Sequence, residues 1–231
     1  MGFSRGFFVQ RALFFVVFVF GLMVTTLPAA ADSVDIQTNA DAFIYSNIDY
    51  QDDNYGGSSF VSIGAQYTGQ NYVRGLLNFD TLNVPELAGA TVLSVELVTT
   101  TSNWFAFDDG NPDSQIALYG VDGSWAENSV TWNTRPAIGT QVGSDILTVT
   151  GSAPATVSWD IPMSVWARSS NLDFYLALTN EGNMTGIYRA DSRESSGTPA
   201  YVHVNYVPEP GTMALLGIGL AGLAFIRRRK K

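Results

Sequence analysis

The chain has 231 residues, a formal charge of −9 and no cysteine. The absence of cysteine excludes disulfide cross-links and thiol chemistry, so any folded domain must be stabilised by core packing. The excess of acidic residues would repel phosphate backbones, which argues against a nucleic-acid partner.

The first 31 residues have the pattern of a secretory signal peptide. Two arginines precede an apolar run from Ala12 to Val24, and small residues follow at Ala29 and Ala31. This order of basic, apolar and small-residue regions predicts export, with cleavage before Asp32. An uncleaved membrane anchor is the alternative interpretation.

The segment from Asp32 to Val207 has the size of one domain with a sizeable core. It holds 20 acidic residues, five arginines and no lysine, which gives a formal charge of −15. Short runs of alternating apolar and polar residues, separated by turn residues, predict an all-β sandwich. The clearest runs are Tyr72 to Phe79, Thr91 to Thr101, Gln115 to Val121, Asp173 to Thr179 and Ala200 to Tyr206.

Two local patterns refine this prediction. In the run from Thr91 to Thr101, Leu93, Val95 and Leu97 fall on one face, which we expect to be the core face. The stretch from Ile161 to Trp166 is long enough for only a turn or two of helix.

Several motifs follow one another through this segment, and a Trp-x-Glu motif followed by Val-Thr-Trp-Asn-x-Arg-Pro is the most specific. In order they are Ala40-Asp41-Ala42-Phe43, Asn54-Tyr55-Gly56, Arg74 to Asp80, Trp125-Ala126-Glu127, Val130 to Pro136, Trp159-Asp160-Ile161 with Trp166, and Ser192-Arg193-Glu194. Together they resemble the DNRLRE domain, which is similar to the family-96 carbohydrate-binding modules. The resemblance implies a β-sandwich of jelly-roll type, polysaccharide as a partner, and framework roles for Trp125, Trp132, Trp159 and Trp166.

Three arginines lie in or beside apolar strands. A guanidinium there can fork onto a carboxylate, so we expect Arg74, Arg135 and Arg193 to form structural ion pairs. Direct ligand binding by one of these arginines is the alternative. The expected carboxylate partners are Asp80, Glu127, Asp160 and Glu194.

An aromatic and acidic insertion, SNWFAFDDGNPDS, departs from the family pattern. Aromatic faces stack on sugar rings, and carboxylates accept hydroxyl hydrogen bonds or hold calcium. We therefore expect Trp104, Phe105, Phe107, Asp108 and Asp109 to bind the ligand. A packed end of the sandwich and an ordinary solvated turn are the alternatives. Structural calcium is expected either at Asp108, Asp109 and Asp113 or at Asp49, Asp52 and Asp53, and no other cofactor is required.

Catalytic motifs are missing from the sequence. The one histidine, His203, alternates with Val202 and Val204 and is expected to face solvent. No nucleophile elbow or zinc-binding helix motif is present. We therefore expect non-catalytic carbohydrate binding. A structural matrix protein without a discrete ligand and a polysaccharide-active enzyme are the alternatives.

The C-terminal residues combine the motif Pro208-Glu209-Pro210, an apolar segment from Gly211 to Ile226 and five basic residues. As a helix the apolar segment would reach about 24 Å, which is short for a bilayer core of roughly 30 Å. These features resemble a PEP-CTERM sorting signal. The resemblance implies an exosortase-type processing enzyme in a Gram-negative bacterium, a transient membrane anchor, and a final place at the cell surface or in the extracellular matrix. A permanent anchor, a buried core helix and a GPI signal are the alternatives.

Overall fold

The computed structural model describes residues 30–65, 71–106, 114–149, 156–166, 171–179 and 186–209, without the side chains of 101–106, 114 and 148–149. The chain divides into two compact units. The larger consists of residues 33–86 and 92–205, and the smaller combines residues 87–91 with both ends of the chain. The described elements are β1 (Asp32–Gln37), β2 (Ala40–Tyr45), β3 (Phe60–Ala65), β4 (Tyr72–Phe79), η1 (Pro85–Leu87), β5 (Thr91–Ala106), β6 (Ser114–Asp122), β7 (Ala137–Val149), β8 (Thr156–Asp160), β9 (Leu172–Leu178), β10 (Gly186–Asp191) and β11 (Tyr201–Val207).

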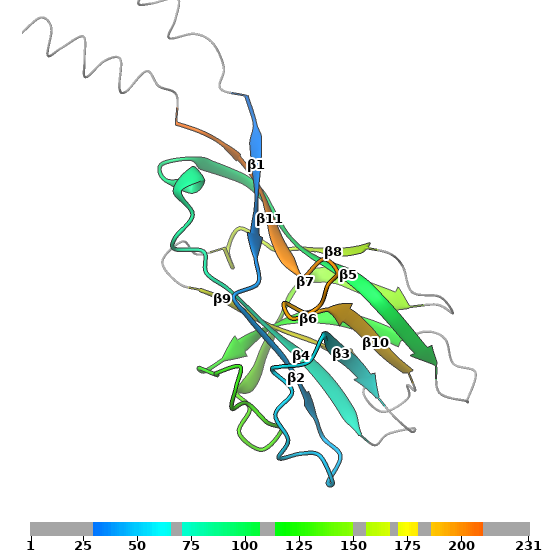
Figure 1. The fold of residues 1–231 in the computed structure, drawn as a ribbon. Helices are drawn as coiled ribbons and strands as arrows, with labels where there is room; N and C mark the ends of the chain where they lie inside the picture. The colour runs from blue at the N-terminus through cyan, green and yellow to red at the C-terminus, as the bar shows by residue number, and fades with distance from the viewer. Residues whose placement is uncertain are drawn as a thin grey trace, which may run out of the picture. The chain divides into compact units, whose positions relative to one another are not determined.

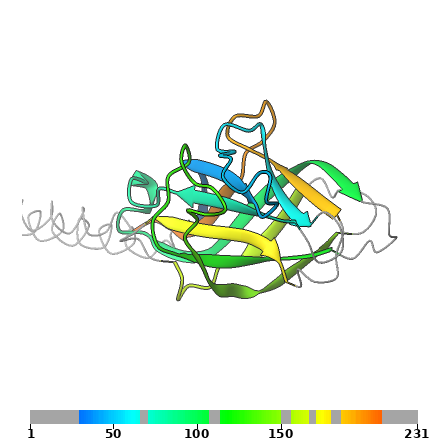
Figure 2. The ribbon, with the colours of Figure 1, turned by 90° about the horizontal axis from the view of Figure 1, so that it is seen from below.

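The strands form two antiparallel sheets packed as a sandwich, which confirms the predicted fold class (Figures 1 and 2). The order of paired strands is β1-β11-β5-β10-β3-β4-β9-β6-β7, with β2 on β4 and β8 on β5. The pairing of β3 with β4 is limited to two residue pairs, Gly64 with Val73 and Ala65 with Tyr72. The strand β3 also contacts β9 and β6 without pairing with them. It therefore faces these two strands across the core.

The core is built from the inward residues of both sheets. Trp159, Tyr175, Tyr188, Phe79 and Phe174 are the largest fully buried side chains. Their area dominates the burial that stabilises a sandwich without disulfides. Trp166 is buried as well, so both of these framework tryptophans lie where the family resemblance predicted.

The prediction that Leu93, Val95 and Leu97 face the core is correct for Val95 and Leu97. Val95 and Leu97 are buried, whereas Leu93 is 52% exposed. Leu93 lies before the part of β5 that pairs with β8, which runs from Glu96 to Thr100. The predicted turn after Ile161 is a single turn, closed by hydrogen bonds from Val165 and Trp166 to the carbonyl of Pro162.

The strand β5 is longer than predicted. It continues to Ala106, and the backbones of Trp104 and Phe105 pair with Tyr188 and Ile187 of β10. The first part of the predicted insertion is therefore strand, because β10 offers a pairing edge that sequence pattern does not show.

Of the predicted ends of the chain, residues 1–29 and the apolar segment 211–226 lie outside the described residues. Among the residues that are described, none of the helical structure has the length and hydrophobicity needed to span a membrane.

Candidate functional site

A polar cluster surrounds Arg193, in the turn that follows β10. Its Nη2 atom lies 2.6 Å from Oε2 of Glu127, and its Nε donates to Oε1 of Glu194 at 3.2 Å. Its Nη1 donates to the carbonyl oxygen of Asn39 at 2.9 Å. A guanidinium presents its donors in a planar fork, so this one side chain joins three segments that are distant in the sequence.

Asp41 of β2 lies beneath this guanidinium and is only 2% exposed. Its Oδ2 accepts the backbone N–H of Arg193 at 2.8 Å, and its own N–H donates to Oε1 of Glu127 at 3.0 Å. Burial raises the pKa of the Asp41 carboxyl to about 7, although the bond from the Arg193 N–H acts to lower it. We refer to Asp41, Glu127, Arg193 and Glu194 as the Arg193 cluster. Sequence reasoning gave Asp41 no role, although it belongs to one of the family motifs.

The carboxylates of this cluster have the spacing of cation ligands. Oxygens of Asp41, Glu127 and Glu194 all lie within 4.8 Å of one another, and this is the one such grouping in the part of the chain that the structure describes. The guanidinium of Arg193 already lies against two of the three carboxylates and supplies positive charge there. The arrangement therefore acts as a structural cross-link.

The first predicted calcium loop does not bring its three carboxylates as close together within the described residues. These carboxylates belong to Asp49, Asp52 and Asp53. Asp52 accepts a hydrogen bond from Nδ2 of Asn133 at 2.7 Å. Calcium at this loop stays a prediction. Two of the aspartates in the other loop, Asp108 and Asp109, lie outside the described residues, as does Asp113.

The Asn54-Tyr55-Gly56 motif holds Glu127 in place. Nδ2 of Asn54 donates to the carbonyl oxygens of Glu127 and Val130, at 2.7 and 2.8 Å. A Cβ atom at Gly56 would lie 2.0 Å from the carbonyl oxygen of Glu127, so no other residue fits this approach without backbone movement. Two family motifs that are separate in the sequence thus form one structural unit.

Trp132 lies beside two of the predicted ion-pair arginines. The guanidinium carbons of Arg74 and Arg135 lie 4.8 and 4.0 Å from the centroid of its ring, and Nη1 of Arg135 donates to its carbonyl oxygen. Such cation–π contacts stabilise both partners. Trp125 and Trp132 also pack against a buried cluster that includes Val130. The most specific motif of the family is therefore packed against the sheet.

The two remaining predicted carboxylates have local roles. Asp80 accepts hydrogen bonds from Nδ2 of Asn83 at 2.7 Å and from the N–H of Leu82 at 3.1 Å, and these bonds hold its pKa below the usual value. Asp160 ends β8, where its backbone N–H donates to Oδ2 of Asp145 at 2.7 Å. The structure does not bring Asp80 or Asp160 into the Arg193 cluster.

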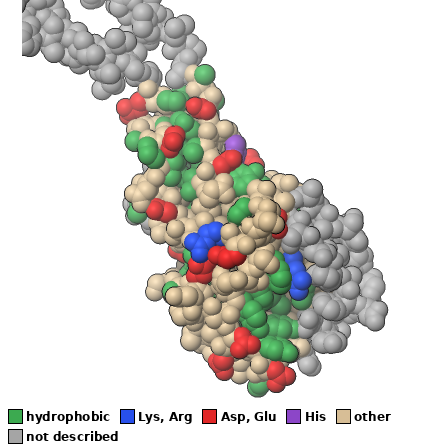
Figure 3. Space-filling model, viewed as in Figure 1, with side chains coloured by type: hydrophobic (Ala, Val, Ile, Leu, Met, Phe, Trp, Pro, Cys, Tyr) green, Lys and Arg blue, Asp and Glu red, His purple; other side chains and the backbone are tan. Residues whose placement is uncertain are grey.

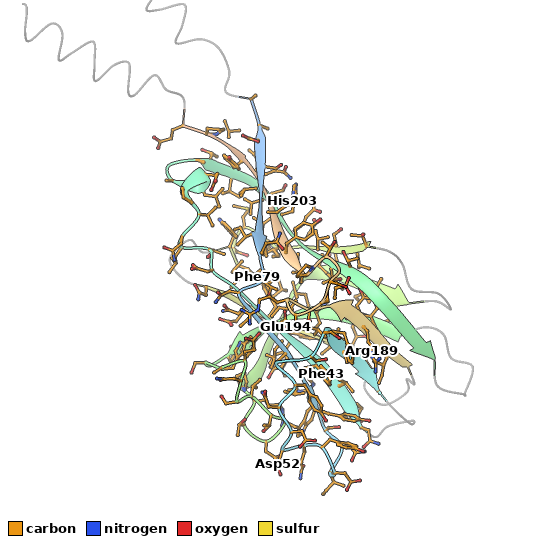
Figure 4. All side chains as sticks on the ribbon, viewed as in Figure 1. Phe43, Asp52, Phe79, Arg189, Glu194 and His203 are labelled. Atoms are coloured by element: carbon orange, nitrogen blue, oxygen red, sulfur yellow. The ribbon has the colours of Figure 1, made fainter. Side chains whose placement is uncertain are left out.

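A groove lies beside the Arg193 cluster, over β3, β10 and the turn 194–197. Phe60 and Asp191 are cross-strand neighbours, and Arg189 lies on the same face of β10, two residues before Asp191. Ser59 and the turn complete its walls, and we call it the Asp191 groove. Figure 3 shows two blue basic patches on one face, one beside red carboxylates and the other beside green hydrophobic side chains, and Figure 4 labels Arg189 and Glu194 in the same view.

Phe60, which lines the groove, belongs to a column of stacked aromatic rings. The Phe43 ring stacks on Tyr55 at 4.4 Å between centroids and on Phe60 at 5.8 Å. The Arg189 guanidinium lies 4.0 Å from the centroid of Phe60, and burial lowers the pKa of Arg189. The Phe60 ring is therefore held by Phe43 and Arg189.

Of the predicted ligand-binding residues, only the backbones of Trp104 and Phe105 are described, in β5. Phe107, Asp108 and Asp109 lie outside the described residues. His203 pairs with Asp35, with 2.6 Å between Nδ1 and Oδ1, while Val202 and Val204 beside it are buried.

The predicted processing residues are described in part. Ala29 and Pro210 lie outside the described residues, whereas Ala31, Pro208 and Glu209 lie within them. In the smaller unit the carboxyl group of Glu209 lies against Gly89, where a Cβ atom would come within 2.7 Å of Cδ.

Comparisons with known proteins agree with these motifs. A model described as carbohydrate-binding module family 96 matches residues 32–206, and a model described as a PEP-CTERM protein-sorting motif matches residues 207–230. The first match covers more than half of the chain and includes the whole Arg193 cluster and the whole Asp191 groove. A search of curated proteins finds no match.

Proposed function

Because the chain belongs to carbohydrate-binding module family 96, we propose that it binds a polysaccharide without altering it chemically, at the cell surface or in the extracellular matrix. The observation that carries this proposal is the family match over residues 32–206, nearly the whole segment between the two predicted sorting signals. Modules of this kind are typically non-catalytic.

The ligand-binding part of this proposal includes the aromatic segment that begins at Trp104. A ring that stacks on a sugar there would contribute about 1 to 3 kcal/mol, so Trp104→Ala is expected to weaken binding and leave folding nearly intact. Lost stability with unchanged affinity would instead make Trp104 a packing residue.

A glycan array tests the proposed function directly. The full chain, solubilised in detergent, is applied with calcium and with a chelator. Binding in both conditions supports a calcium-independent module, and binding only with calcium supports the predicted structural calcium. The absence of binding to any glycan would favour a structural matrix protein, and turnover of a polysaccharide would favour an enzyme.

The sorting motif implies export and exosortase-mediated surface sorting. We propose that the segment 211–226 anchors the protein only until the motif Pro208-Glu209-Pro210 is recognised and the tail is removed. Glu209→Ala leaves the apolar segment unchanged, so insertion is expected to persist while processing is impaired. Mass spectrometry of surface and medium fractions, in a host that carries the sorting enzyme, decides this. A mature wild-type protein that still ends in Lys231 would show a permanent anchor.

A further inference from the structure

The sorting motif begins at the point where the last strand ends. Val207 is the last residue of β11, and Pro208 follows it directly. Both residues are half buried, and Tyr206 before them is only 5% exposed. Glu209 is the first exposed residue after the strand. The first part of the motif is therefore held by the folded chain and is not separated from it by a linker.

The side chain of Glu209 lies against the turn Leu87–Thr91, which belongs to the same compact unit. A Cβ atom at Gly89 would lie 2.7 Å from Cδ of Glu209, and 2.8 and 3.1 Å from its two carboxylate oxygens. Leu87 and Ala90 are buried, and the N–H of Ala90 donates to the carbonyl oxygen of Leu87 at 3.2 Å. The turn is thus anchored in the fold, and the carboxyl group approaches it closely because Gly89 has no side chain.

This contact restrains the charged group of the motif. The prolines on either side of Glu209 have no backbone N–H, so a partner cannot bind the motif through a continuous ladder of backbone hydrogen bonds and has to read its side chains. The Glu209 carboxylate forms no hydrogen bond or ion pair within the described residues, so a basic group of a partner can pair with it. The side of the carboxylate that faces Gly89 is closed to such a partner.

An enzyme that encloses the whole motif has to open this end of the domain. It has to draw Glu209 away from Gly89 and free Val207 from β11. A partner that binds only the open form has its apparent affinity reduced by the fraction of protein that is open. Resting on the proposed removal of the tail, we propose that the turn Leu87–Thr91 makes an autoinhibitory contact, which holds Glu209 to the domain and slows recognition by the processing enzyme. Because the contact contains no hydrogen bond, it delays recognition without preventing it.

A pulse–chase measurement of tail removal tests this proposal, with the full chain in a host that carries the sorting enzyme. Gly89→Asn places a Cβ atom where the Glu209 carboxyl group lies, and asparagine tolerates the φ of +75° at this position. Gly89→Ala adds the same Cβ atom, but alanine tolerates this φ poorly. Both variants are expected to shorten the half-time of tail removal by about threefold or more.

Two further variants separate the contact from a general loss of stability. Gly123→Ala introduces a side chain at another positive φ, +122°, where the Cβ atom would lie 3.5 Å from Cβ of Pro136 in ordinary contact. It is expected to leave the half-time unchanged. A flexible Gly-Ser-Gly-Ser insertion between Val207 and Pro208 keeps the turn intact but lets the motif leave it, so it is expected to shorten the half-time as Gly89→Asn does.

The outcomes distinguish the contact from the processing itself. Unchanged or slower removal with the insertion, or in a folded Gly89→Asn protein, would overturn the proposal and leave removal of the tail intact. Equally fast removal in Gly123→Ala and Gly89→Asn would overturn it as well, because general destabilisation would then explain the effect. If the wild-type protein kept Lys231 throughout the chase, the proposed removal of the tail would fail.

Discussion

The Arg193 cluster and the Asp191 groove lie next to each other and contain similar residues, but their polar atoms differ in pairing. Each side chain of the Arg193 cluster has a hydrogen-bond or ion-pair partner. In the groove, Asp191, Ser59 and Ser196 have none among the residues that the structure describes. Paired polar groups hold a fold together, whereas unpaired groups in a groove are available to a ligand.

The difference shows that a charged motif can have a purely structural role. Arg193 and Glu194 belong to a motif that resembles the family pattern, yet their contacts join β2, the loop at Glu127 and the turn after β10. Asp191 belongs to no quoted motif, yet its carboxylate faces the groove. We therefore expect substitutions in the cluster to change stability more than substitutions in the groove.

Arg193→Ala is expected to have the largest effect on stability. It removes three hydrogen bonds of the guanidinium and leaves Asp41, Glu127 and Glu194 close together without their counter-charge. Because the Arg193 side chain is 44% exposed, solvent screens part of this interaction, and we expect a loss of about 2 kcal/mol in the free energy of unfolding, measured by urea denaturation. Arg193→Lys keeps the charge without the fork and should lose less. A change below about 1 kcal/mol in Arg193→Ala would contradict the structural role of the cluster.

Asp41 is expected to make stability depend on pH. Its pKa is raised from 3.8 to about 7 in the folded protein, mainly by burial. Between these values the folded protein holds a proton that the unfolded chain has released, so stability falls as pH rises from about 4 to 7. The expected loss between pH 5 and pH 7 is about 2 kcal/mol. Urea denaturation across this range tests it.

The matched variant for this prediction is Asp41→Asn, which retains an oxygen that can accept from the N–H of Arg193. It has no titrating group at this position, so its stability should change less over the same pH range. Parallel pH profiles for the wild-type protein and the variant would show that Asp41 does not cause the dependence.

The alternation of apolar and polar residues predicted the strands well because it is a local property of each segment. The strand β4 has the predicted bounds, and β6, β9 and β11 differ from the predicted runs by one residue at each end. The error at β5 arose where pairing with β10 extends the strand to Ala106, since a pairing edge from a distant segment leaves no local signal.

The candidate site was less predictable because its environment comes from distant segments. Burial of Asp41 depends on Glu127 and Arg193, which follow it by 86 and 152 residues. The position of Asp191 depends on Phe60, in another strand, and on Gly197 in the turn. The composition predicted that the arginines need partners. The fold shows that the Trp132 ring is a partner of Arg74 and Arg135.

Arg135→Lys tests the packing around Trp132 and should have an intermediate effect. A lysine retains the charge but loses the planar group that lies over the ring and donates to the Trp132 carbonyl. We expect a loss of about 1 kcal/mol in the free energy of unfolding. Urea denaturation measures this loss. The affinity of the same variant for carbohydrate is expected to stay unchanged. An unchanged midpoint would show that this contact does not stabilise the fold.

Asp191→Ala should have the smallest effect on stability. The carboxylate has no partner within the described residues, so its removal breaks no hydrogen bond and relieves some repulsion in a segment with a formal charge of −15. We expect the free energy of unfolding to change by less than about 0.5 kcal/mol, or to rise slightly. Urea denaturation at several salt concentrations measures both effects, because screening removes the repulsive part. A loss above about 1 kcal/mol would mean that Asp191 supports the fold as Arg193 does, and the two regions would no longer differ.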